Sequence, residues 1–172
     1  RSFIGNDPFA ILLPDDVVQS KTSCLKQMVD VYNRTGGNVL AVTEVPREKT
    51  DQYGILDVGH DDGKLVEVKG LVEKPKPEEA PTNLSVIGRY ILTADVLPHL
   101  AKLEKGAGGE VQLTDAMAKM IGHVPFHGFR YEGRRFDCGN KIGFLEAQIA
   151  FSLEREDLAD EVREFLKTYQ AK

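Results

Sequence analysis

The sequence predicts an α/β fold with a mixed sheet flanked by helices, and three observations support this. Residues 9–13 are five consecutive apolar residues that end at a proline, which suits a strand covered on both faces. Residues 38–45 form a second β-rich run, continuously apolar over 39–42, that ends at Pro46. Between these runs, apolar residues recur at helical spacing from 25 to 32. A strand, a helix and a strand in this order favour a right-handed parallel unit.

The remaining elements follow from local signals. Ser23 is a candidate N-cap for the first helix, and Gly36-Gly37 ends it. Alternating runs on either side of Asp61-Asp62-Gly63 predict a hairpin, and three prolines between 75 and 81 predict an extended loop. After this loop the sequence predicts a strand over 84–92, helices over 93–102 and 113–121, short strands over 126–131 and 135–137, and helices over 141–155 and 158–169.

Composition restricts the possible partners. The chain has 172 residues, a formal net charge of −5 and an isoelectric point near 5.4, which argues against nucleic acid as a partner. No apolar run approaches the length of a membrane span, and the first residues show no export signal. We therefore expect a cytoplasmic protein without a membrane partner. Cys24 and Cys138 are expected to be small buried apolar residues.

Two carboxylates follow the first predicted strand directly, Asp15 and Asp16. Open α/β sheets bind ligands at the carboxyl ends of their strands, and oxygen ligands of this kind suit Mg²⁺. The alternative is that Pro14-Asp15-Asp16 is an ordinary turn with a helix cap.

Two further stretches carry polar groups at strand ends. Glu73 and Lys74 place an acid beside a cation, a pair that suits a sugar phosphate, although a solvated ion pair beside a turn is the simpler interpretation. Neighbouring strand residues point to opposite faces, so both side chains can serve one ligand only where the strand gives way to a loop. Gly54 would let the backbone come close to a ligand, or would simply form a bend.

Asp137 ends another predicted strand, just before Gly139 and a helix. It could share a metal with Asp15, or it could cap the following helix. Arg130, Arg134 and Arg135 are expected to form an ordinary solvated face. The four histidines, His60, His99, His123 and His127, lack the spacing of metal ligands.

Taken together, these motifs resemble a known family. They are Leu-Leu-Pro-Asp-Asp at 12–16, Gln-Tyr-Gly-Ile at 52–55, Val-Glu-Lys-Pro at 72–75, Gly-Ala-Gly-Gly-Glu-Val-Gln-Leu-Thr-Asp at 106–115 and Asp-Cys-Gly-Asn-Lys at 137–141, together with 83–90. In this order they resemble the glucose uridylyl branch of the sugar-1-phosphate nucleotidylyltransferases. The run at 106–115 is the most specific part.

The resemblance implies a Rossmann-like nucleotide-diphospho-sugar transferase fold, and a reaction in which UTP and glucose 1-phosphate give UDP-glucose and pyrophosphate. It implies that Asp15 binds Mg²⁺ and that Asp137 is the second acid near the metal. It also implies that Glu73 and the Gly54 backbone bind sugar hydroxyls, and that Lys74 binds the phosphate. Asp15, Lys74 and Asp137 are then the residues expected to carry catalysis. A homo-oligomer is expected.

The family's glycine-rich Gly-x-Gly-Thr-Arg loop, which holds the nucleotide, is absent from this sequence. We therefore expect a single domain over 1–172 that is truncated at its N-terminus, with a sugar-binding part at 9–140 and C-terminal helices at 141–172. On its own this chain is expected to show little or no turnover.

Two alternatives stay open. One is a related enzyme that uses dTTP or ATP, or another sugar. The other is a non-catalytic assembly module, in which the helices from 141 onward form a subunit interface. Apolar residues fall near one face of the first of these helices at Ile142, Leu145, Ile149 and Leu153, although packing on the chain's own sheet would explain them equally well.

Overall fold

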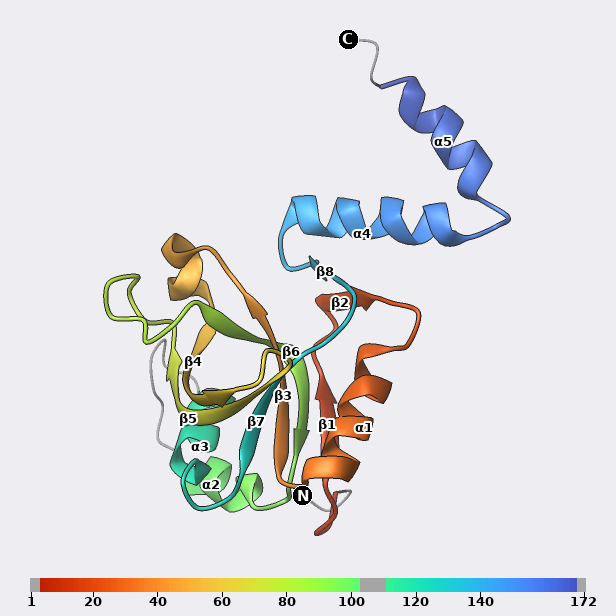
Figure 1. The fold of residues 1–172 in the computed structure, drawn as a ribbon. Helices are drawn as coiled ribbons and strands as arrows, with labels where there is room; N and C mark the ends of the chain where they lie inside the picture. The colour runs from red at the N-terminus through yellow and green to blue at the C-terminus, as the bar shows by residue number, and fades with distance from the viewer. Residues whose placement is uncertain (1–3, 103–110, 170–172) are drawn as a thin grey trace. The chain divides into compact units, whose positions relative to one another are not determined.

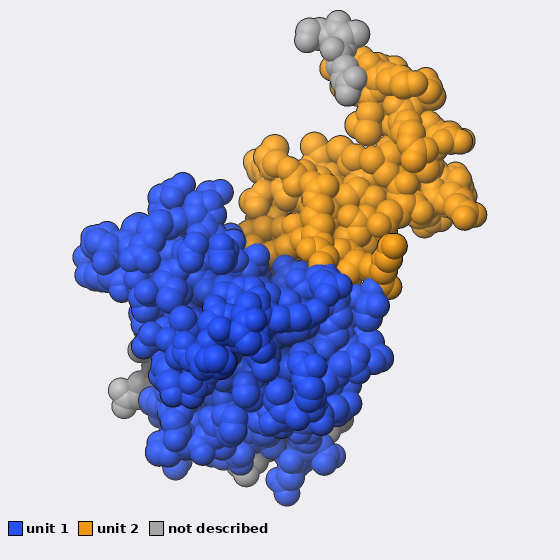
Figure 2. Space-filling view, in the orientation of Figure 1, with its two compact units in different colours: residues 1–13, 22–132 blue, residues 14–21, 133–172 orange. Residues whose placement is uncertain are grey.

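The residues described by the computed structural model, 4–102 and 111–169, divide into two units, which Figure 2 shows in different colours. The first unit comprises residues 1–13 and 22–132, and the second comprises 14–21 and 133–172. The chain passes from the first unit to the second after Leu13, returns to the first at Thr22 and passes to the second again after Glu132. A single domain over 1–172 stays a prediction.

The first unit contains a six-stranded mixed sheet (Figure 1). Its order is β1 (Phe9–Leu12), β6 (Leu84–Leu92), β3 (Asn38–Glu44), β7 (Phe126–Arg130), β5 (Leu65–Glu73) and β4 (Gly54–Asp61). β3 and β7 run parallel, and the other pairs are antiparallel. β4 also reaches β6 through Ile55 and Ser85. The predicted hairpin is confirmed as β4 and β5.

Helices cover both faces of this sheet. α1 (Cys24–Thr35) packs on β3 and β6, while α3 (Leu113–Met120) packs on β5 and on α2 (Val96–Lys102) (Figure 1). Residues Val39 to Val42 of β3 are all buried, as their continuous apolar run predicted. The predicted start and end of α1 are confirmed, because Ser23 accepts a hydrogen bond from Lys26 and Gly36 is the C-cap. A short 3₁₀ helix, η1 (Arg47–Gln52), was not predicted.

The first strand was predicted to be covered on both faces, and this was wrong. β1 is a half-buried edge strand that pairs antiparallel with β6, and Leu12 and Leu13 are 48% and 42% exposed. β1 and β3 do run in the same direction, but β6 lies between them, so they do not form an adjacent parallel pair. An apolar run shows that a strand can be buried, but it does not show which strand will pair with it. The partner of β1 is β6, which lies some 80 residues later in the chain.

The second unit is built on a two-stranded antiparallel ladder of β2 (Asp16–Gln19) and β8 (Arg134–Asp137), followed by α4 (Lys141–Glu154) and α5 (Ala159–Lys167). β2 was not predicted. Asn140 caps α4 by accepting a hydrogen bond from the Gly143 amide. Ile142 and Leu145 of α4 are 66% and 54% exposed. Within the described residues, no helix is both long and apolar enough to cross a membrane.

Candidate functional site

The β4–β5 hairpin brings Gly54 and Glu73 together. They are directly opposed in the antiparallel register, although 18 residues separate them in the chain. A β-carbon on Gly54 would lie 3.3 Å from Oε2 of Glu73, so the missing side chain leaves room for this carboxylate. The Glu73 side chain is only 15% exposed. Two of the predicted sugar-binding residues therefore lie side by side.

Lys74 follows in an unusual backbone conformation. Its φ of +47° lies in the left-handed region, and it is the only described residue other than glycine with a positive φ. Its amide donates to the carbonyl of Tyr53 at 3.0 Å, and its Nζ lies 3.9 Å from Oε1 of Glu73. β5 ends at Glu73, so the backbone leaves the strand where the two side chains would otherwise point to opposite faces. Glu73 and Lys74 thus form an ion pair where the strand ends, and their joint binding of one ligand stays a prediction.

Thr114, in the first turn of α3, is a neighbour that the sequence prediction did not assign. Its methyl carbon lies 3.6 Å from the position of a β-carbon on Gly54. Thr114 belongs to the 106–115 run that carried the family resemblance. Residues 106–110 of that run lie outside the described residues, so its glycine-rich half cannot be placed.

In the second unit, Asp15 and Asp137 face a common space beside Gly139. A β-carbon on Gly139 would lie 3.1 Å from Oδ1 of Asp137 and 3.4 Å from Oδ2 of Asp15. The Gly139 amide donates to Oδ1 of Asp137 at 3.1 Å, and the Cys138 amide donates to the Asp15 carbonyl at 2.7 Å. Helix capping does not explain Asp137, because Asn140 fills that role for α4.

Asp16, the neighbour of Asp15, has a different environment. It is buried, and the guanidinium of Arg135 donates to both of its oxygens, from Nε at 2.6 Å and from Nη2 at 3.1 Å. Asp16 is thus held in an ion pair and is not arranged as a metal ligand. The turn-and-cap interpretation of 14–16 also fails for Asp16, because this residue starts β2.

The predicted solvated arginine face was wrong for two of its three members. Arg135 is 17% exposed, and Arg130 is 28% exposed in a two-bond pair with Asp61 at 2.8 and 2.9 Å. Hydrogen bonding from Arg130 holds the pKa of Asp61 below its usual value. Arg134 does lie at the surface, 61% exposed, with its guanidinium over the Phe136 ring.

The donor set at Gly139 suits a hard divalent cation such as Mg²⁺ or Mn²⁺. Two carboxylate oxygens border a space that a side chain would otherwise fill, and Mg²⁺ commonly takes only one or two protein carboxylates, with water and phosphate oxygens completing its shell. Across 4–102 and 111–169, no group of three or more His, Cys, Asp or Glu side chains is arranged to hold a metal. A closed zinc site of the structural kind is thus absent from this part of the chain.

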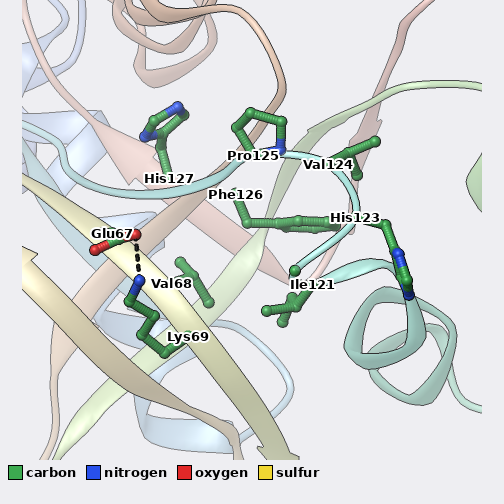
Figure 3. A pocket seen from close by; sticks show the side chains of 10 residues that line it. Glu67, Val68, Lys69, Ile121, His123, Val124, Pro125, Phe126 and His127 are labelled. Carbon is green, nitrogen blue, oxygen red and sulfur yellow. Dashed lines mark hydrogen bonds and ion pairs between the residues drawn. The ribbon is translucent and has the colours of Figure 1, made fainter.

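A separate pocket of about 490 Å³ lies in the first unit, and none of the predicted site residues lines it. Figure 3 shows the ion-paired Glu67 and Lys69 of β5 near Phe126 and His127 at the start of β7. Burial lowers the pKa of His127, although the nearby Glu67 carboxylate opposes this shift. Among the described residues, Nε2 of His127 is buried without a hydrogen-bond partner.

The cysteine prediction was half right. Cys24 is 4% exposed in α1, while Cys138 is only partly buried, and neither forms a disulfide.

Comparison with known proteins gives consistent matches. A family model described as nucleotidyl transferase matches residues 1–152. The chain is 84% identical over 142 residues to a UTP–glucose-1-phosphate uridylyltransferase of Komagataeibacter xylinus, covering 83% of this chain and 50% of that protein. It is 45% identical over 167 residues to one of Staphylococcus haemolyticus, covering 97% and 58%.

Solved structures agree with these matches. A UDP-glucose pyrophosphorylase complexed with UDP-glucose has a TM-score of 0.84 at 37% identity, covering 90% of this chain and 59% of that chain. A UTP-bound UGPase from Acinetobacter baumannii has a TM-score of 0.84 at 37% identity, covering 96% and 57%. The chain spans between half and three fifths of the length of these relatives.

Proposed function

The chain belongs to the nucleotidyl transferase family, and from this premise we propose that it is part of an enzyme that converts UTP and glucose 1-phosphate to UDP-glucose and pyrophosphate. The observation that carries the proposal is the 84% identity to a uridylyltransferase over 142 residues, a stretch that amounts to 83% of this chain. The paired Glu73 and Lys74 and the paired Asp15 and Asp137 supply side chains of the kind that this chemistry needs.

The proposed roles follow from the chemistry of each group. The Glu73 carboxylate accepts hydrogen bonds from sugar hydroxyls, and the Gly54 backbone approaches the sugar. The Lys74 ammonium holds the phosphate oxygens of glucose 1-phosphate. Asp15 and Asp137 would hold Mg²⁺, which when bound neutralises charge on the nucleotide phosphates.

Such a reaction needs position and charge neutralisation more than it needs a protein nucleophile. The sugar phosphate attacks the α-phosphorus of the nucleotide in line, and pyrophosphate leaves. The contribution of Lys74 is to orient the attacking phosphate and offset its charge. We propose that the 172 residues alone hold sugar phosphate and metal but show little or no turnover, since their sequence lacks the Gly-x-Gly-Thr-Arg loop.

The test measures pyrophosphate release from glucose 1-phosphate with UTP, dTTP or ATP, using both this chain and a version extended to the length of its relatives. Preference for UTP in the extended protein is expected, and preference for dTTP or ATP would favour the related enzymes instead. Lys74→Ala and Asp137→Asn should each lower the rate without unfolding the protein. If both variants keep full activity, the assigned roles are wrong.

We propose that the protein acts in the cytoplasm and that it self-associates through α4. Exposed Ile142 and Leu145 support the second part, because apolar residues this exposed are typical of surfaces that meet a partner. An assembly module without activity would keep its oligomeric state and lose nothing measurable when Asp15 and Lys74 are substituted.

A further inference from the structure

Arg135 lies on the same face of the β2–β8 ladder as Asp16 and Asp137. Asp16 is directly opposite Asp137, and Val18 is directly opposite Arg135. Because side chains alternate along a strand, residues 135 and 137 of β8 point to one face, together with residues 16 and 18 of β2. Arg134 and Phe136 point to the other face.

This register creates an electrostatic problem. Two carboxylates that are directly opposed on an antiparallel pair repel each other and destabilise the ladder. The Arg135 guanidinium donates two hydrogen bonds to Asp16, and its Nη2 also lies 3.9 Å from Oδ2 of Asp137. Asp16 thus anchors the guanidinium, and the guanidinium faces Asp137 at ion-pair distance.

The two oxygens of Asp137 therefore have different surroundings. Oδ2 faces Arg135, while Oδ1 accepts from the Gly139 amide and borders the space shared with Asp15. A rotation of the carboxylate would move Oδ2 away from Arg135. We propose that Arg135 is a positioning residue for Asp137, holding Oδ2 so that Oδ1 stays directed at the cation space beside Asp15. This inference rests on the metal role in the proposed function.

A positioning role for Arg135 and a purely electrostatic role predict opposite effects of its removal on cation binding. If Arg135 acted only as a positive charge, its removal would strengthen cation binding, because the site would become more negative. If it positions Asp137, its removal weakens cation binding despite the more favourable charge. Replacement by lysine separates the two further, since lysine keeps the charge but lacks the fork that binds Asp16 and reaches Asp137 together.

The experiment measures the dissociation constant of Mn²⁺ for the purified protein, from the paramagnetic resonance signal of the free ion. The variants are Arg135→Gln, Arg135→Lys, Asp15→Asn and Asp137→Asn. Arg134→Gln is the matched control, because it also removes one positive charge from β8, but from the other face of the ladder, where the Arg134 side chain is 61% exposed. Circular dichroism and thermal unfolding establish that each variant is folded. Should Arg135→Gln unfold by leaving Asp16 buried and unpaired, Asp16→Asn with Arg135→Gln replaces it and keeps the net charge.

The expected result is binding weakened by about tenfold or more in both Arg135 variants, a typical effect of losing a group that orients a metal ligand, with Arg134→Gln at least as tight as the parent. Wild-type or tighter binding by Arg135→Gln, by its charge-balanced replacement or by Arg135→Lys overturns the positioning role. If the parent shows no saturable Mn²⁺ binding, or if Asp15→Asn and Asp137→Asn bind as the parent does, the metal assignment of the proposed function fails first, and this inference fails with it.

Discussion

Two substitutions of Lys74, whose backbone is left-handed, should differ in protein stability but not in ligand binding. Lys74→Gly and Lys74→Ala both remove the ammonium, but only glycine adopts a φ of +47° without a steric penalty. An L-residue in this region costs about 1–2 kcal/mol, and the extra freedom of glycine in the unfolded chain returns about 0.5–1 kcal/mol. Lys74→Gly should therefore be more stable than Lys74→Ala by roughly 0.5–1 kcal/mol.

The lost ion pair with Glu73 should change this difference little. Its atoms are 3.9 Å apart and the Lys74 side chain is 56% exposed, which places it among surface pairs of small value. Loss of Lys74 should nevertheless weaken binding of glucose 1-phosphate equally in both variants. A hydrogen bond to a charged group contributes about 1.5–3 kcal/mol, which corresponds to roughly a 10- to 150-fold higher dissociation constant.

Urea unfolding gives the free energy of unfolding for both variants, and titration calorimetry gives the dissociation constant of glucose 1-phosphate. Similar slopes against urea would show that the two variants unfold in the same manner. If Lys74→Ala is instead more stable than Lys74→Gly by about 0.5–1 kcal/mol, the difference left when only the freedom of glycine counts, the backbone at this position is not strained. If either variant binds glucose 1-phosphate as the parent does, Lys74 is not the phosphate ligand.

Three more predictions concern other parts of the chain. In Gly54→Ala, the new β-carbon at 3.3 Å from Glu73 should displace that carboxylate and weaken glucose 1-phosphate binding about tenfold, whereas unchanged binding in calorimetry would contradict this. The pKa of His127 is depressed by burial, so its contribution to stability is present above its ordinary value near 6.5 and is lost as the pH falls through the lowered pKa. The free energy of unfolding should therefore fall less between about pH 7.5 and about pH 5 in His127→Gln than in the parent. If both proteins lose the same free energy of unfolding over this range, His127 does not have this role. Ile142→Glu with Leu145→Glu should lower the mass found by light scattering, and a monomeric parent would remove the basis for self-association through α4.

The accuracy of the sequence prediction depended on how local each signal was. The cap at Ser23, the alternation around Asp61-Asp62-Gly63 and the continuous run at 39–42 are read over a few residues, and each predicted element is present. β1 has the same kind of apolar run as β3, but its burial depends on β6, which pairs with it only in the folded chain. β2 was missed because Asp16–Gln19 is a strand only through its ladder with β8.

The site shows the same division. The motifs predict five site residues: Asp15, Gly54, Glu73, Lys74 and Asp137. The structure brings Gly54, Glu73 and Lys74 together in one unit and Asp15 and Asp137 together in the other. Arg135 was misjudged as solvated because its partner, Asp16, lies 119 residues away. A signal for it did exist, since residues 135 and 137 share a face of any strand that contains both.

Two polar residues that are adjacent in sequence can share a ligand only if their side chains point to the same side. Whether they do depends on whether both residues lie inside a strand ladder. Inside a ladder neighbours point apart, so Arg134 lies at the surface beside Phe136 and Glu146, while Arg135 is paired with Asp16 on the other face. Two side chains that are adjacent in sequence can meet one ligand only if the backbone leaves the strand between them. The positive φ of Lys74 provides this departure directly after Glu73. Asp15 and Asp16 are adjacent residues that do not act together. The ladder begins at Asp16, whose carboxylate accepts hydrogen bonds from Arg135. Asp15 lies just outside the ladder and faces the space beside Gly139.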